Sequence, residues 1–204
     1  MDRKAKVNII GGTGRRALNI AAFTGNLEAV RILIENGAEI DPNEEYWYGS
    51  ALGAAARRGH ADVVKFVLSK NWNASRPMMT YGSFLTAAAT YNHLSVFETL
   101  LEIEGRELII EQALQAAAQR GYALIVKAIL DKTNLNKTCT LRTQKAFSIA
   151  AFYGRTEVLK LLPREGLEQE QLDKALYQAT DNEHEETVKL LLDFNADPNA
   201  EGPE

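Results

Sequence analysis

The first residues whose spacing suggests chemistry are the glycines near the start of the chain. Residues 7–10 ("VNII") form a β-rich run, "GGTG" occupies 11–14, and Glu35 follows a second, mainly apolar run at 30–34. In a dinucleotide-binding enzyme, such glycines let the backbone approach a pyrophosphate, and an acidic residue about 20 positions on binds the ribose. This pattern raises the alternative of an NADP-dependent reductase.

The other reactive residue types occur at spacings that favour structural roles. His60, His93 and His184 each occupy the same place in a repeated phrase, so we interpret them as structural residues at helix starts; metal ligands would have to converge on one point. Cys139 is the only cysteine, which excludes an intrachain disulfide and is typical of a reducing compartment. The acidic run at 165–173 is interpreted as a solvated connector. We therefore expect no catalytic, cofactor-binding or metal site.

Composition excludes several classes of partner. The chain has 204 residues, of which 46% are apolar and 25% charged, enough to bury a core in one elongated or one or two compact domains. No apolar run approaches the roughly 20 residues that span a bilayer, and the start lacks the apolar segment of a secretory signal. A net charge of −4 and a pI near 5.5 argue against nonspecific nucleic-acid binding. These features predict a cytoplasmic or nuclear protein with no membrane, nucleic-acid or small-molecule partner.

One phrase recurs six times and defines the elements that carry these residues. The copies are "ALNIAAFTGN" (17–26), "ALGAAARRGH" (51–60), "FLTAAATYNH" (84–93), "ALQAAAQRGY" (113–122), "AFSIAAFYGR" (146–155) and "ALYQATDNEH" (175–184). We call the ninth position of each phrase the marker: Gly25, Gly59, Asn92, Gly121, Gly154 and Glu183. The markers are separated by 34, 33, 29, 33 and 29 residues. A period near 33 predicts a repeat architecture rather than a dinucleotide-binding domain.

Each repeat is predicted to contain two short helices. In the first, a large apolar residue stands three positions before a small one, as Leu52 does before Ala55, so both share one helical face. A second apolar segment follows, with a one-sided stripe such as Val64 and Val67, which can be buried only against a neighbouring repeat. Glycine and asparagine markers readily adopt the left-handed conformation that closes a helix, whereas Glu183 predicts strain or a frayed junction.

With these repeats the chain resembles the ankyrin-repeat family over nearly its whole length. The family's two helices and β-hairpin finger are similar to "GHADVV" (59–64) after a first helix, and to "NGAEID" (36–41) and "FNADPN" (194–199) after a second. The resemblance implies an all-α ankyrin-repeat solenoid of about six helix-turn-helix repeats with short β-hairpin fingers, in a single domain over 1–204. The expected boundaries are a partial finger at 1–14 and then 15–48, 49–81, 82–110, 111–143, 144–172 and 173–204.

The departures from the family pattern also carry expectations. The family's Thr-Pro-Leu-His tetrapeptide is absent, so only Ser50 and Ser83 offer N-cap hydroxyls at the expected helix starts. The form "YGSAL" (48–52) is similar to a variant in long arrays of filamentous fungi, often attached to signalling ATPases. "AKVN" (5–8) matches the end of a finger, which assigns the glycines at 11–14 to a hairpin turn and implies a segment of a longer array.

Partner-binding residues are expected where the repeats differ from one another. In the family, partners contact the finger tips and the two positions before each marker, and here these positions are rich in arginine and aromatic residues, which are enriched at interfaces. Phe23 and Phe152 have the alternative of packing against the next helix. The predicted partner-binding residues are Phe23, Tyr46, Trp47, Arg57, Arg58, Met79, Thr90, Tyr91, Gln119, Arg120, Phe152 and Tyr153.

Two of the marker intervals are four residues short, at "EIEGRELIIE" (102–111) and around Pro163. Those junctions are expected to lack fingers, and Pro163 is expected to end its helix about a turn early because it cannot donate the interior hydrogen bond. The longest apolar and aromatic surface is therefore predicted on repeats one to three.

The sequence as a whole predicts a non-enzymatic module that binds another protein through its concave face and fingers, with no cofactor. Two alternatives stay open. One is a regulatory sensor array of a larger signalling ATPase, and the other is the NADP-dependent reductase raised by the opening glycines.

Overall fold

The computed structural model describes residues 6–11, 16–40, 50–70, 78–102, 110–133 and 140–199, with the backbone alone for 78–83. The chain divides into two compact units, Met1–Ile109 and Ile110–Glu204, called unit 1 and unit 2. Each unit is built from helix pairs joined by tight turns.

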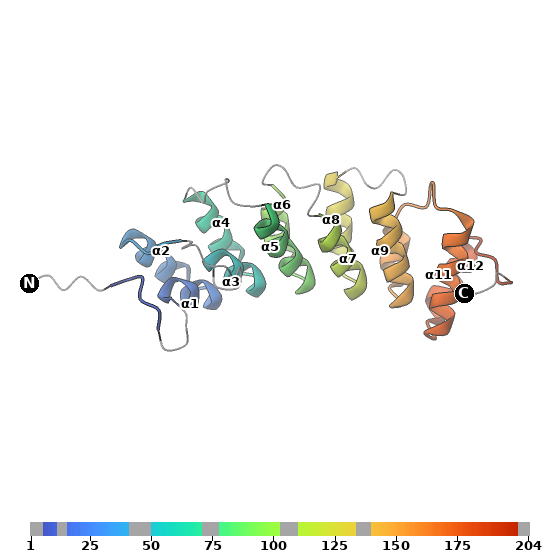
Figure 1. Ribbon diagram of the computed structural model, residues 1–204, viewed down its shortest axis with the longest axis horizontal. Helices are drawn as coiled ribbons and strands as arrows, with labels where there is room; N and C mark the ends of the chain where they lie inside the picture. Colours follow the sequence, from blue (N-terminus) through green and yellow to red (C-terminus); the bar gives the residue numbers. More distant parts are fainter. Residues whose placement is uncertain are drawn as a thin grey trace, which may run out of the picture. The chain divides into compact units, whose positions relative to one another are not determined.

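The described part of unit 1 forms three helix pairs, coloured blue to green in Figure 1. The pairs are α1 (Ala17–Thr24) with α2 (Leu27–Glu35), α3 (Ala51–Arg58) with α4 (Ala61–Ser69), and α5 (Met78–Thr90) with α6 (Leu94–Leu101). Helix α3 packs between α1 and α5, which are the first helices of the neighbouring pairs. Helix α4 contacts α2 and α6, which are the second helices of those pairs. The first helices therefore form one layer and the second helices another.

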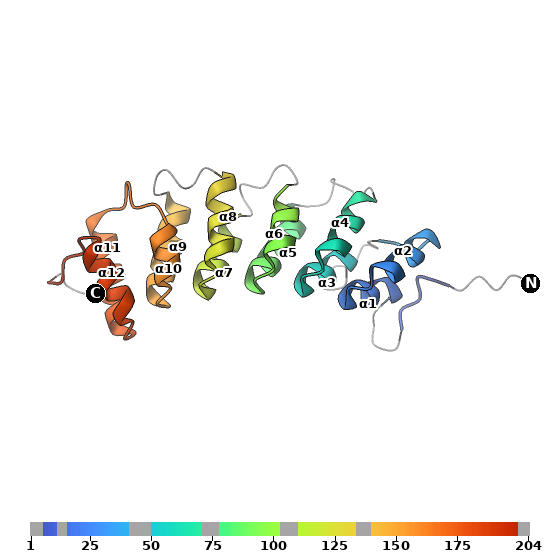
Figure 2. The same ribbon diagram turned by 180° about the vertical axis from the view of Figure 1, so that it is seen from behind.

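Unit 2 repeats the same arrangement. Its pairs are α7 (Ile110–Arg120) with α8 (Ala123–Thr133), α9 (Leu141–Phe152) with α10 (Thr156–Leu161), and α11 (Gln169–Asp181) with α12 (Glu185–Asp193). Here α9 packs between α7 and α11, and α10, which is visible in Figure 2, contacts α8 and α12. The predicted all-α fold of helix-turn-helix repeats is confirmed. Of the predicted hairpins, the described residues contain one isolated antiparallel bridge, Ile10 to Arg16.

The core follows the repeated apolar pattern. Leu52 is 1% exposed and Ala55 is fully buried on α3, while Val64 and Val67 of α4 are fully buried below them. Small alanines on the first helices let neighbouring helices approach closely, and the large residues three positions earlier fill the space between the two layers. The equivalent residues of the other repeats are also buried, except Leu33 and Val188, which are half-buried.

All six markers have a left-handed backbone, which the sequence predicts for the five glycine and asparagine markers. The φ angles are 73° at Gly25, 80° at Gly59, 59° at Asn92, 79° at Gly121, 64° at Gly154 and 61° at Glu183. A non-glycine residue at such an angle carries steric strain because its Cβ approaches the backbone. Glu183 therefore holds the strained junction expected of it.

The helix starts match the sequence only in part. Ser50 Oγ accepts a hydrogen bond from the Gly53 amide at 2.9 Å, so it is the expected N-cap. The expectation for Ser83 is wrong, because α5 begins at Met78 and Ser83 lies inside the helix. A cap that the sequence analysis did not predict is Thr140 at the start of α9, whose amide donates to Thr143 Oγ1 at 2.7 Å in a reciprocal capping box.

The short connection before α11 follows from Pro163. Helix α10 ends at Leu161 after six residues, whereas α4 and α12 have nine each, which confirms the expected early end. The connection at 162–168 contains one hydrogen-bonded turn, Leu167 N to Arg164 O at 2.9 Å, and no strand. The other short junction, at 103–109, lies outside the described residues.

Candidate binding surface

The residue that follows a marker bonds to the repeat before it. In four places a side-chain nitrogen at this position meets the main-chain carbonyl two positions before the preceding marker. The four links, over 2.9–3.0 Å, join His60 to Phe23, His93 to Arg57, Arg155 to Gln119 and His184 to Phe152. Because a carbonyl oxygen only accepts, each imidazole Nε2 carries the proton and donates it. These bonds confirm the structural interpretation of the histidines.

The same side chains lie directly on the markers. A Cβ atom built on Gly25 would lie 2.5 Å from Nδ1 of His60, and one on Gly59 would lie 2.5 Å from Nδ1 of His93. Such separations are far below contact distance, so Gly25 and Gly59 need to be glycine for space as well as for their positive φ. The links thus fix the backbone at positions where the sequence predicts partner binding.

The side chains at these positions also pair across the repeats. The guanidinium carbon of Arg58 lies 4.8 Å above the ring of Phe23, and that of Arg57 lies 5.3 Å above the ring of Tyr91, both within cation–π range. In unit 2, Gln119 Nε2 donates to the Tyr153 hydroxyl at 2.9 Å. Every pair joins the residue two positions before one marker to the residue one position before the next marker. We call these three pairs, Phe23–Arg58, Arg57–Tyr91 and Gln119–Tyr153, the paired row.

Most of the predicted partner-binding residues that the structure describes are exposed. Tyr91 is 46% exposed, Phe152 42% and Tyr153 38%. Arg57, Arg58, Gln119 and Arg120 are exposed as well. Phe23 is half-buried beneath Arg58, and Thr90 is half-buried with its hydroxyl donating to the Thr86 carbonyl at 2.7 Å.

The exposed Phe152 ring lies edge-on to Tyr153, with centroids 5.0 Å apart. The predicted residues Tyr46 and Trp47, and the side chain of Met79, lie outside the described residues. The structure therefore places side chains from nine of the predicted residues and brings six of them into pairs.

A groove lies between α7 and α9 beside the Gln119–Tyr153 pair. Its volume is about 360 Å³, and it is lined by Gln112, Gln115, Ala116, Gln119, Ile149 and Tyr153. Four of these were not predicted, because the expected binding positions on the first helices were only the two before each marker. The position six before the marker also varies among the copies, which is the signal that would have found Gln115: Asn19, Gly53, Thr86, Gln115, Ser148 and Tyr177.

An ion pair joins α7 to α9 next to Gln115. Lys145 Nζ donates to Glu111 Oε1 at 2.8 Å, and Gln115 Nε2 donates to the same oxygen at 3.1 Å. The hydrogen bond from Lys145 is the main cause that lowers the pKa of the Glu111 carboxyl, and the charges of Lys145 and Arg142 lower it further. Glu111 is therefore ionised at neutral pH and its charge is balanced.

The described residues do not place the aromatic surface on repeats one to three as expected. Tyr91 is the exposed aromatic side chain described in unit 1, whereas Phe152, Tyr153 and Tyr177 are all exposed in unit 2. The finger residues on which that expectation partly depended lie outside the described ranges.

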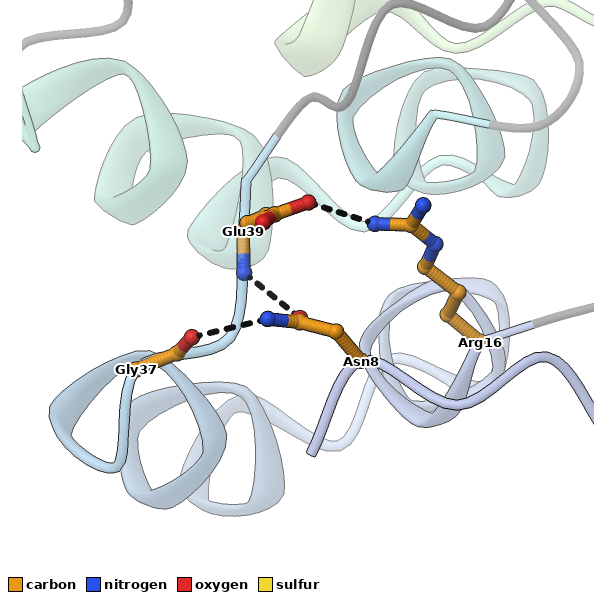
Figure 3. Close-up of polar contacts among 4 residues, drawn as sticks. All are labelled: Asn8, Arg16, Gly37 and Glu39. Carbon is orange, nitrogen blue, oxygen red and sulfur yellow. Dashed lines mark hydrogen bonds and ion pairs between the residues drawn. The ribbon is translucent and has the colours of Figure 1, made fainter. Parts of the chain in front are cut away.

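The opening segment contacts the residues that follow α2. Asn8 Nδ2 donates to the Gly37 carbonyl at 3.2 Å, and the Glu39 amide donates to Asn8 Oδ1 at 2.9 Å, as Figure 3 shows. Arg16 forms an ion pair with Glu39 at 2.8 Å in the same place. The second apolar run, 30–34, lies within α2 rather than in a strand. The strand order that a dinucleotide-binding unit requires is therefore contradicted.

Within the described ranges, no three His, Cys, Asp or Glu side chains gather where they could hold a metal ion. The helices found there are all too short or too polar to cross a bilayer. Cys139 lies outside the part of the chain that the structure describes.

The comparison with protein families identifies the repeats. A family model for ankyrin repeats, described as three copies, matches residues 18–112 and again 114–202. The ankyrin repeat and KH domain-containing protein mask-1 of Caenorhabditis elegans is 27% identical over 172 residues, which is 81% of this chain and 6% of that protein. The Notch-regulated ankyrin repeat-containing protein A of Danio rerio is 43% identical over 65 residues, 31% of this chain and 56% of that protein. The chain thus spans only part of the length of these relatives.

Solved structures show the same fold. The human ASB11 ankyrin repeat domain superposes with a TM-score of 0.74 at 23% identity, covering 92% of this chain and 87% of that one. A chain in the structure of the predatory endopeptidase Bd0816 from Bdellovibrio bacteriovorus in complex with immunity protein Bd3460 has a TM-score of 0.64 at 26% identity, covering 87% of this chain and 97% of that one.

Proposed function

The chain belongs to the ankyrin-repeat family, and from that premise we propose that it is a non-catalytic module that binds another protein through the paired row and the adjoining first-helix surface. Repeats of this family generally serve as protein-binding modules. The observation that carries the proposal is the paired row itself, in which exposed arginine, aromatic and amide side chains are held by partners in the next repeat.

Pairing of this kind favours binding more than it favours folding. An exposed cation–π pair contributes only about 0.5–1 kcal/mol, a small fraction of the stability of a domain. An ordered side chain, however, loses less conformational entropy when a partner covers it, a saving of about 0.5–1.5 kcal/mol for each residue. Arginine and tyrosine are also the residue types that dominate binding hot spots.

The charge of the row differs between the units. The positions before the markers of unit 1 contain Arg57 and Arg58 and no acidic residue, in a chain whose net charge is −4. Among the described residues, the guanidinium of Arg58 contacts the ring of Phe23 and no carboxylate. In unit 2, the positions before the markers contain both a basic residue, Arg120, and an acidic one, Asp181, so their charges offset each other. An acidic partner surface therefore complements the row in unit 1.

Site-specific photo-crosslinking tests this function. A photoreactive amino acid would replace Arg58 of the paired row, or Phe152, whose ring contacts Tyr153 of the row. In the control proteins it would replace Lys65 of α4 or Lys127 of α8, both exposed on second helices. In extracts of the source cells, we expect positions 58 and 152 to crosslink to a discrete protein and positions 65 and 127 not to do so. The unlabelled chain should compete, and its Arg58→Ala variant should compete less well. Equal crosslinking at all four positions, or none at 58 and 152, would count against the proposal.

A further inference from the structure

We propose that the groove between α7 and α9 binds a short, extended and uncharged stretch of polypeptide through the main chain of that stretch. This inference rests on the proposed function and names the kind of segment that unit 2 would take. We call the site the amide groove, with the lining residues given above.

The polar groups of the groove match those of a peptide backbone. A glutamine side chain carries the same carbonyl acceptor and N–H donors as a peptide unit. Gln112 is exposed and has no hydrogen-bond partner among the described residues. Gln115 uses one amide hydrogen on Glu111, and Gln119 uses one on the Tyr153 hydroxyl. Both carbonyl oxygens remain able to accept, and the Tyr153 hydroxyl remains able to donate.

The spacing of these groups also suits an extended chain. Gln112, Gln115 and Gln119 are three and four residues apart on α7, so they lie on one face with a rise of roughly 4.5 and 6 Å between them. An extended chain rises about 3.3 Å per residue, so groups that point the same way recur roughly every 6.6 Å. About three to four residues of an extended segment would cover the glutamine row.

The side chains that line the groove determine which side chains the bound segment can carry. Ala116 and Ile149 give the groove an apolar floor with room for a small side chain, and its volume of about 360 Å³ is that of a small ligand site. None of the lining side chains is ionised, and Glu111, which precedes Gln112 on α7, is already paired with Lys145. A charged side chain would find no counter-ion in the groove and would lose its hydration there, so an uncharged segment is favoured.

The amide groove belongs to α7 and not to every repeat. At the register of Gln115, α1 has Asn19, which is only 5% exposed, and α3 has the buried Gly53. Those positions cannot offer the amide that the half-buried Gln115 presents to the groove. The site is therefore a property of these residues and not a general consequence of the helix-pair fold.

The test uses the intact chain and a random library of uncharged peptides about seven residues long. The peptide that binds most strongly becomes the probe. Removing one hydrogen bond typically changes affinity up to about tenfold, so Gln115→Ala and Gln119→Ala should each weaken the probe by that order. Gln144→Ala, a glutamine of α9 outside the groove lining, is the matched control and should leave affinity unchanged. Methylation of the probe's central main-chain nitrogens should weaken it equally, because methylation removes the donors that the glutamine carbonyls accept. Circular dichroism and melting curves would verify that each variant folds.

Three outcomes would overturn the inference: no peptide is selected, the probe binds the two groove variants as well as the parent, or N-methylation leaves its affinity intact. A cellular partner that crosslinks at position 58 or 152 and is indifferent to Gln115→Ala and Gln119→Ala would also overturn it, while leaving the proposed function in place. The inference is supported if the probe binds both groove variants more weakly than the parent chain, if methylation weakens the probe, and if Gln144→Ala binds it as well as the parent does.

Discussion

His60 fills the space that a side chain on Gly25 would need. Its Nδ1 atom lies 2.5 Å from the position of a Cβ on Gly25, and its Nε2 atom donates to the Phe23 carbonyl at 3.0 Å. The ring therefore bonds the end of one first helix while covering the glycine that closes it. His93 on Gly59 repeats this arrangement, so the glycine of one repeat and the histidine of the next act together.

Substituting Gly25 by alanine should cost more than substituting Gly37. Both have positive φ, 73° and 88°, but Gly37 has nothing within 4 Å of a new Cβ. Gly37→Ala should therefore cost only the left-handed strain, about 1–2 kcal/mol. Gly25→Ala should lose about 1 kcal/mol more, because the displaced His60 ring gives up its hydrogen bond. Urea unfolding would measure both, and equal losses would show that the ring does not constrain the marker.

A double-mutant cycle should reveal the coupling between the two residues. His60→Ala alone should cost about 1 kcal/mol for the lost bond to Phe23. In the His60→Ala background, Gly25→Ala should become only as costly as Gly37→Ala, since nothing then blocks the new methyl group. Strictly additive losses in urea unfolding would contradict this account.

Glu183 should be a site where glycine stabilises the protein. It is exposed and holds φ at 61°, and no side-chain bond is described for it. Glu183→Gly removes the strain but adds freedom to the unfolded chain, for a net gain of about 0.5–1 kcal/mol. Asn92→Gly, at φ 59°, should gain less because asparagine tolerates this region better. The prediction fails if thermal unfolding shows Glu183→Gly to be neutral or destabilising.

Much of this fold follows from the repeated phrase, because the same physical demands recur in every repeat. Left-handed closure at the markers and burial of residues such as Leu52 and Ala55 could be predicted from one sequence. The start of α5 could not, because the family's capping position pointed to Ser83. Helix α5 instead begins at Met78, five residues before Ser83.

The candidate site could be predicted only as a set of positions. Variation among the repeats indicated residues such as Arg58 and Tyr153, but their pairing with Phe23 and Gln119 depends on how neighbouring helices are offset, which the sequence does not state. The amide groove was missed because Gln112 and Gln115 lie further back along the helix. Their register varies too, and variation alone does not tell an exposed amide from a buried one such as Asn19.

The two serines considered as helix caps should respond differently to alanine. Ser50 is 4% exposed and accepts the Gly53 amide bond, so Ser50→Ala should cost about 1 kcal/mol or more. Ser83 lies within α5, where alanine is the better helix former, so Ser83→Ala should be neutral or slightly stabilising. The comparison would be made by urea unfolding, and a similar loss from both variants would restore Ser83 as a cap.

The Glu111–Lys145 pair, which joins α7 to α9, should give the folded state a small pH dependence. The hydrogen bond from Lys145 lowers the pKa of Glu111 in the folded protein below its ordinary value of 4.5. A carboxyl with a lowered folded pKa adds stability above its unfolded pKa, and that stability is lost as pH falls through the folded value. The pair is largely exposed, so its contribution should stay below about 1 kcal/mol.

Lys145→Ala should raise the pKa of Glu111 towards 4.5 in an NMR titration of its side chain and should reduce the loss of stability in acid. Lys127→Ala, on α8, should change neither. If the Glu111 pKa did not move in Lys145→Ala, the hydrogen bond from Lys145 could not be what lowers it.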